Sequence, residues 1–148
     1  MGSIVAVIVA GGKGERMQAD IRKQYLVLDG IAILSRTLLA FTEISAIETV
    51  YLVVPENDFD FCTQQILPAV QNKFSIQLVK GGESRQKSVY NGLSAITDPD
   101  SIVIIYDGVR PFVPFRPTEE AIVWAEKQGG CILGSPVVDT LKSVGNNG

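Results

Sequence analysis

The segment Ile4-Val-Ala-Val-Ile-Val9, followed by Ala10-Gly-Gly-Lys-Gly-Glu-Arg16-Met17, decides the fold of this chain. Six apolar residues, most of them β-branched, are typical of a strand that is buried on both faces. The glycines that follow predict a turn whose main-chain NH groups approach an anion closely. Arg16 and, just beyond the turn, Lys23 add permanent positive charges. We therefore predict a strand leading into a phosphate-binding loop, although the spacing alone also fits a plain strand-to-helix connection with solvated cations.

The rest of the chain alternates short β-branched runs with segments of helical periodicity. Further strands are expected at 50–54, 75–79 and 102–106, with a last one starting at 131–133 and leading into 136–142. Helical spacing covers 33–41, 61–70, a segment capped by Ser84, and a segment that begins near 117–120. This alternation predicts an α/β fold of the Rossmann-like kind, with a mainly parallel sheet and helices on both faces.

Composition narrows the class of protein. With 148 residues, 46% of them hydrophobic and 20% charged, the chain has the size and composition of one compact domain. Its 13 Lys and Arg against 16 Asp and Glu argue against a general nucleic-acid binder. No apolar run reaches the roughly 20 residues that span a bilayer, so we expect a cytoplasmic protein without membrane contact. Cys62 and Cys131 are expected to be buried free thiols.

The chain has no histidine. This excludes Ser-His-Asp and Cys-His catalysis as well as His-ligated zinc. Any chemistry must therefore depend on positioning and charge. An attacking phosphate monoester suits such a site, because its second pKa of about 6 leaves it largely ionised at neutral pH without a general base.

Three loops carry the candidate site residues: Gly11 to Arg16, Gly81 to Arg85, and Asp107 to Arg110. Each follows a predicted strand, and ligands of open parallel sheets bind at the carboxyl ends of the strands. The first loop has neither the spacing of a P-loop nor that of a dinucleotide fingerprint. It fits a mononucleotide-binding loop of another type.

The other two loops leave alternatives open. In the second, a double glycine precedes a helix that carries Ser88, which suits close approach to a base or ribose, or a simple helix cap with solvated charges. In the third, Asp107 ends a buried strand, which favours Mg²⁺ shared with substrate phosphates over a turn cap or an ion pair with Arg110. Arg22 stands beside Lys23, and spacing does not decide which of these cations faces a ligand.

Five segments together resemble the 2-C-methyl-D-erythritol 4-phosphate cytidylyltransferases of the non-mevalonate isoprenoid pathway. They are Ala10 to Met17, Lys23-Gln-Tyr25, Gly81-Gly-Glu-Ser-Arg85 with Ser88, Asp107-Gly-Val-Arg-Pro111, and Pro136-Val-Val-Asp-Thr-Leu-Lys142. The resemblance implies a Rossmann-like nucleotidyltransferase fold. It also implies transfer of CMP from CTP to 2-C-methyl-D-erythritol 4-phosphate, with Mg²⁺ and release of pyrophosphate.

The resemblance also implies roles for single residues. Arg16 and Lys23 would stabilise the transition state, and Asp107 would sit beside the metal. The substrates would be held by Ala10, Gly11, Gly12, Gly14, Gly82, Glu83, Ser88 and Gly108. Asp139 and Thr140 would lead into a β-arm that exchanges with a second subunit and helps to bind the sugar phosphate, which implies a homodimer.

Two departures from the family pattern stand out. Arg22 occupies a position that is usually proline, and Gly145-Asn-Asn-Gly148 reaches a hairpin turn with no return strand after it. We therefore expect residues 1–148 to be a single nucleotide-binding domain, incomplete at its C-terminus, with a β-arm starting at about 136–148. The alternatives are a ribitol-5-phosphate cytidylyltransferase and a nucleotide-binding fragment without catalysis.

Overall fold

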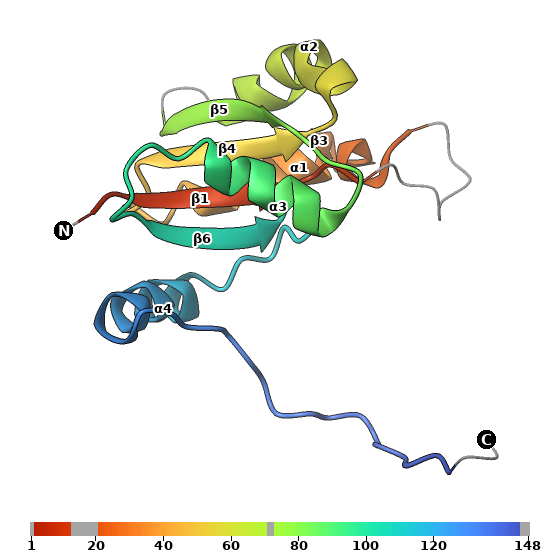
Figure 1. Ribbon diagram of the computed structural model, residues 1–148. Coiled ribbons are helices and arrows are strands. Elements are labelled where there is room, and N and C mark those ends of the chain that lie inside the picture. The colour runs from red at the N-terminus through yellow and green to blue at the C-terminus, as the bar shows by residue number, and fades with distance from the viewer. Residues whose placement is uncertain (1, 13–20, 71–72, 146–148) are drawn as a thin grey trace.

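A parallel sheet forms the centre of the protein (Figure 1). The structure is a computed structural model that describes residues 2–12, 21–70 and 73–145. Its main sheet has four strands in the order β5-β4-β1-β6, all parallel: β1 (Ile4–Val9), β4 (Thr49–Val54), β5 (Ser75–Lys80) and β6 (Ile102–Asp107). Val9 pairs with both Val53 and Asp107, so the strands end at one common edge. The expected α/β fold with a parallel sheet is confirmed.

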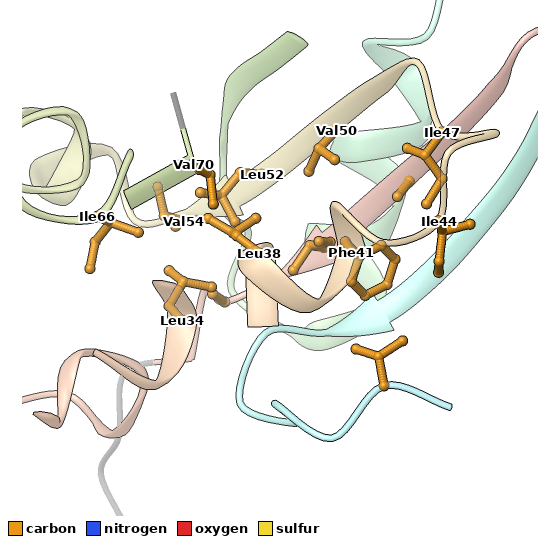
Figure 2. Packing of buried hydrophobic residues seen from close by; sticks show 14 of the residues in the cluster. Leu34, Leu38, Phe41, Ile44, Ile47, Val50, Leu52, Val54, Ile66 and Val70 are labelled. Atoms are coloured by element: carbon orange, nitrogen blue, oxygen red, sulfur yellow. The ribbon is translucent and has the colours of Figure 1, made fainter. Parts of the chain in front are cut away.

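Helices cover both faces of this sheet, as the alternating pattern predicts. On one face, α1 (Ile33–Phe41) packs on β1 and β4, and Figure 2 shows Leu34, Leu38 and Phe41 directed into the cluster that contains Leu52. On the other face, α3 (Arg85–Ser94) lies over a smaller cluster formed around Val7 and other valines of the sheet. The strand residues alternate between the two clusters, which explains why β1 is buried along its whole length.

Local sequence signals set the bounds of these elements. Ser84 caps α3, because its side chain accepts a hydrogen bond from the Lys87 amide at 3.1 Å. The short antiparallel pair β2 (Val27–Leu28) and β3 (Ile31–Ala32) turns at Asp29 and Gly30, whose φ angles of 51° and 76° are those of a tight hairpin turn. Helix α4 (Phe115–Gln128) ends at Gly129, which has a φ of 83°.

The helix predicted over 61–70, with Pro68 expected to end or kink it, is helical but not one regular helix. The structure has three short pieces there, namely α2 (Phe59–Phe61), the π-helical η3 (Cys62–Ile66) and the 3-10 helix η4 (Leu67–Val70). The 3-10 helix η2 (Glu56–Asp58) precedes them. Pro68 has no amide hydrogen and disrupts a regular helix at this point. The irregular path still buries Cys62, Ile66 and Val70, so the apolar spacing correctly identified the core residues.

The strand predicted at 131–133, with its continuation over 136–142, is also wrong. After α4 the described chain runs away from the sheet (Figure 1), and Ile132 is 94% exposed. A strand requires a hydrogen-bonded partner and an apolar surface to cover, and residues 131–145 pair with no strand of the described chain. For the same reason Cys131 is exposed and not buried, whereas Cys62 is buried, and both thiols are free.

Within the described ranges, no helix is long and apolar enough to cross a membrane.

Candidate functional site

A cleft of about 1050 Å³ opens at the carboxyl edge of the sheet, between the loops that follow β1, β4 and β5. Its volume is at the upper end of the range for small-molecule sites. Three predicted residues line it: Gly11, Gly82 and Glu83. Arg22, which the sequence left open as a ligand-facing cation, also lines it. So do Lys87 and Asn91, to which the sequence pattern had given no binding role. The N-terminus of α3 faces the cleft through Ser84, which places the positive end of a helix dipole at its wall.

The main-chain amides at this edge are not equally available to an anion. Hydrogen bonds of 2.8 to 3.0 Å to protein oxygens are already donated by the amides of Ala10, Gly81, Gly82 and Gly108. By contrast, the amides of Gly11 and Gly12 donate to no other residue that the structure describes. Among the main-chain amides of the predicted substrate-binding glycines and Ala10 that the structure describes, those of Gly11 and Gly12 are therefore available to an anion.

Ser88 acts inside the protein. Its side chain is only 3% exposed, and its Oγ accepts the Gly82 amide at 3.0 Å. A Cβ placed on Gly11 would lie 3.1 Å from that oxygen, so the lack of a side chain at Gly11 favours the close approach of the first two loops. The structure thus gives Ser88 a role in shaping the cleft, and the substrate-binding role that the resemblance implies for it stays a prediction.

Gly108 permits a second close approach. An added Cβ there would lie 2.9 Å from Leu34 Cδ1 and 3.0 Å from Ala10 Cβ. The Gly108 carbonyl accepts a hydrogen bond of 2.7 Å from the Thr37 hydroxyl of α1. The loop after β6 is therefore fixed against the start of the glycine-rich loop and against α1.

Gln24 is the functional residue that sequence reasoning missed. It is 3% exposed, and its Nε2 donates to the Ala10 carbonyl at 2.8 Å and to the Gly12 carbonyl at 3.4 Å. These bonds tie the turn η1 (Lys23–Tyr25) to the glycine-rich loop. The sequence offered one signal for Gln24, which is its position inside Lys23-Gln-Tyr25, one of the segments that carry the family resemblance.

The structure separates the neighbouring cations. The Nε of Arg22 lies 3.1 Å from Asp58 Oδ2, so Arg22 forms an ion pair. Lys23 is exposed and forms no ion pair with any residue in the described ranges. Arg22, which lines the cleft, is thus held by Asp58, and the ligand-binding role that the resemblance gives to Lys23 stays a prediction. Arg16 and Gly14 lie outside the described residues.

Tyr25 and Cys62 stay protonated in this environment. The Tyr25 hydroxyl donates to Asp58 Oδ2 at 2.8 Å and lies 3.5 Å from Cys62 Sγ. Burial raises the pKa of Tyr25 far above its ordinary value of 10.0, and the hydrogen bonds to Cys62 and Asp58 raise it further. Burial also raises the pKa of the Cys62 thiol above its ordinary value of 9.0. Cys62 therefore presents no reactive thiolate at neutral pH.

The carboxylate of Asp107 is held by two arginines. Its Oδ1 accepts from Nε of Arg85 at 3.0 Å, with the terminal nitrogen of that guanidinium also at 3.0 Å, and its Oδ2 pairs with Nε of Arg110 at 3.1 Å. Of the alternatives that the sequence left open, the ion pair with Arg110 is present, and Arg85 adds a partner that was not foreseen.

The Asp107 carboxylate still has a free acceptor position with which it could bind a metal ion. An ionised carboxylate offers about four acceptor positions, and these contacts occupy three of them. The described residues contain no group of three or more His, Cys, Asp or Glu that would bind a metal by themselves. A Mg²⁺ at Asp107 would thus need ligand oxygens as well, which is how Mg²⁺ commonly binds with phosphates.

Asp139 and Thr140 are not brought to this edge. Both are exposed and lie in the extended segment after α4, which leaves the sheet (Figure 1).

A parallel α/β sheet with a glycine-rich loop, a lysine on the next turn and an aspartate at a strand end is typical of nucleotide-binding proteins of the nucleotidyltransferase class. The chain belongs to the IspD family, because the family model described as 2-C-methyl-D-erythritol 4-phosphate cytidylyltransferase matches residues 4–148.

Individual relatives agree with this assignment. A protein of that name from Clostridium perfringens is 41% identical over 142 residues, which cover 96% of this chain and 62% of the relative. Another, from Geotalea uraniireducens, is 38% identical over 143 residues, covering 95% and 61%. The crystal structure of 4-diphosphocytidyl-2C-methyl-D-erythritol synthase from Anaerococcus prevotii aligns with a TM-score of 0.83 at 28% identity, over 99% of this chain and 60% of that one. The chain thus spans about three fifths of the length of these relatives.

Proposed function

We propose that this chain is the nucleotide-binding part of an enzyme that transfers CMP from CTP to 2-C-methyl-D-erythritol 4-phosphate. A phosphate oxygen of the sugar alcohol attacks the α-phosphorus of CTP and forms a new P–O bond. The bond from the α-phosphorus to the oxygen that bridges to the β-phosphorus breaks, and pyrophosphate leaves with the electron pair. The products are 4-diphosphocytidyl-2-C-methyl-D-erythritol and pyrophosphate.

The observation that carries this proposal is the family match over residues 4–148. The geometry is consistent with it, because the available Gly11 and Gly12 amides, the exposed Lys23 and the nucleotide-sized cleft belong to one edge of the sheet. The chain spans only part of its relatives, so activity, acceptor and partners are proposed for the full-length protein.

In this proposal, Lys23 and Arg16 donate to the α-phosphate and stabilise the extra negative charge of five-coordinate phosphorus. The Gly11 and Gly12 amides bind the phosphates, and the walls at Gly82 and Glu83 accommodate the cytosine and ribose. Asp107 would hold Mg²⁺ together with the triphosphate oxygens, and the metal would neutralise part of the triphosphate charge. The histidine-free chain suits this chemistry, since the attacking phosphate is already ionised.

The proposal also includes the domain organisation, the β-arm and the homodimer that the sequence led us to expect. Residues 1–148 act as a single nucleotide-binding domain, and the segment from about 136 begins a β-arm. That arm carries Asp139 and Thr140 to the sugar phosphate bound by a second subunit of a homodimer. The exposed apolar side chains of the segment support this, because Val138 is 94% and Leu141 is 80% exposed.

The proposed role of Lys23 is tested by Lys23→Ala in the full-length protein, with Arg16→Ala measured alongside. We expect each to lower kcat by about 10² to 10³, the typical loss for one electrostatic donor, with little change in CTP affinity. Lys127→Ala, which removes an exposed cation in the last turn of α4, is the matched control and should leave turnover unchanged. Full turnover in the Lys23 variant would show that its assigned role is wrong.

The acceptor is tested by comparing pyrophosphate release with 2-C-methyl-D-erythritol 4-phosphate and with ribitol 5-phosphate. We expect turnover with the first and little with the second, and the reverse preference would reassign the enzyme. Calorimetric titration with CTP and Mg²⁺ separates the third possibility. Binding of CTP without pyrophosphate release from either acceptor would indicate a nucleotide-binding protein without catalysis.

A further inference from the structure

The turn that carries Lys23 is anchored on both sides of the lysine, while the lysine itself is exposed. Before it, Arg22 forms an ion pair of 3.1 Å with Asp58. After it, the Tyr25 hydroxyl donates to Asp58 at 2.8 Å. Both contacts end on the same atom, Asp58 Oδ2. A single carboxylate oxygen therefore holds the two residues that flank the Lys23-Gln24 dipeptide.

Burial makes these contacts effective. The Asp58 side chain is 16% exposed and that of Arg22 is 31% exposed, so solvent screens the pair only in part. Tyr25 is 8% exposed, and its ring packs against Phe61 with a centroid separation of 4.8 Å. Charge-assisted hydrogen bonds of this kind are roughly twice as strong as neutral ones.

Asp58 belongs to a different part of the sheet edge from the turn that it holds. It lies in η2, directly after Pro55 and the end of β4, whereas Lys23 follows the glycine-rich loop after β1. The contact thus fixes the position of η1 relative to the loop after β4. Glu56 and Asn57, the two residues before Asp58, line the cleft. The lysine turn and one wall of the cleft are linked through Asp58.

We propose that Asp58 is a positioning residue that sets the place of Lys23 through Arg22 and Tyr25. This inference rests on the proposed function of Lys23. Asp58 touches no substrate in this proposal. It fixes the backbone from which the lysine side chain extends, so that the ammonium reaches the phosphate without ordering the turn at each catalytic cycle.

The first test is Asp58→Ala in the full-length protein. We expect kcat to fall about tenfold to a hundredfold while KM for CTP changes less than about threefold, because Lys23 acts in the transition state. Asp60→Ala is the matched control, since it removes an exposed carboxylate two residues away and should leave kcat unchanged. Tyr25→Phe keeps the ring and removes only one of the two contacts, so its kcat should lie between wild type and Asp58→Ala.

A double-mutant comparison separates positioning from general structural damage. In a Lys23→Ala background, Asp58→Ala should lower kcat less than about twofold further, since its effect passes through the missing lysine. An additional loss as large as in the wild-type background would overturn the proposal. If Asp58→Ala does not fold, Asp58→Asn and Tyr25→Phe in the two backgrounds serve for the same comparison.

Hydrogen exchange provides a readout that does not depend on activity. The amides of Tyr25 and Leu26 donate to the carbonyls of Arg22 and Lys23 at 2.9 and 3.2 Å. We expect Asp58→Ala to speed their exchange, while the amides of β1 keep their protection. Unchanged exchange at Tyr25 and Leu26 would refute the proposal even in an active enzyme. A wild-type protein that transfers no CMP would refute the proposed function alone, because the exchange result still decides whether Asp58 holds the turn.

Discussion

Gly92 lies where α3 packs most closely on the sheet, and replacing it with alanine sets two effects against each other. An added Cβ would lie 2.4 Å from Val7 Cγ1 and 3.1 Å from Val53 Cγ2. Both valines are fully buried and β-branched, so neither side chain rotates away easily. The shortest contact is about 1 Å below the ordinary contact distance of 3.4 Å. The helix must therefore move away from β1.

The expected net effect is destabilising. Glycine to alanine inside a helix favours folding by about 1 kcal/mol. One extra methyl group in a packed core costs about 1 to 3 kcal/mol, and the severity of this contact places it near the upper limit. We expect Gly92→Ala to lower the free energy of unfolding by about 1 to 2 kcal/mol. It should also weaken CTP binding, because α3 carries Ser88, which holds Gly82 at the cleft.

Urea unfolding of the full-length protein, followed by far-UV circular dichroism, measures this change. With a typical slope of about 2 kcal/mol per molar urea, the midpoint should fall by about 0.5 to 1 M. Val7→Ala removes the atom that an alanine at 92 would meet, so the double variant should lose less than the two single losses added together. An increase in stability for Gly92→Ala alone would refute this reasoning, since helix propensity would then outweigh the contact.

Two further predictions concern the glycine-rich loop and the N-terminal end of the sheet. Gln24→Glu places a carboxylate against the Ala10 carbonyl and should lower the unfolding free energy by about 1 to 3 kcal/mol, together with CTP affinity. Gln24→Met is the control, because it keeps the length of the side chain and adds no charge. It should lose less unfolding free energy and less CTP affinity in the same urea and calorimetric assays. A Gln24→Glu variant as stable as wild type would contradict the role of Gln24. Hydrogen bonds from the Ser3 amide and, to a lesser extent, from the Asp100 amide hold the pKa of Asp98 below its ordinary value of 3.8. The ionised Asp98 carboxylate therefore stabilises the fold above pH 3.8. This stabilisation is lost as the pH falls through the pKa of Asp98 in the folded protein. Asp98→Asn should therefore lower Tm near neutral pH, and a difference from wild type that fails to shrink in acid would disprove the assignment.

Local patterns identified most elements of the fold correctly. The strands β1, β4, β5 and β6 lie within a residue or two of their predicted bounds. The buried strands β1 and β4 leave a continuous apolar signature, and the partly exposed β5 leaves an alternating one. The cap at Ser84 and the spacing of Leu34, Leu38 and Phe41 were also recognisable, since they depend on neighbours within one or two helical turns. Where partners are distant, prediction failed. The expected strand at 131–133 depended on a pairing that no local pattern encodes, and the same holds for the burial of Cys131.

The candidate site divides in the same way. Residue types and spacing were enough to place three loops at one edge of a parallel sheet and to select Asp107, because chain order and strand direction determine which loops share that edge. The choice of Lys23 over Arg22 came from the family resemblance. The tertiary structure determined which of these groups already bind a protein partner. Arg22 and Tyr25 both bind Asp58, and Asp107 forms ion pairs with two arginines. Ser88 accepts the Gly82 amide, and Gln24 donates to the glycine-rich loop. These contacts join residues that lie from 3 to 36 positions apart in the chain. Local sequence reports the chemistry that a side chain can offer, whereas the partner that takes up that chemistry is chosen by packing between distant elements.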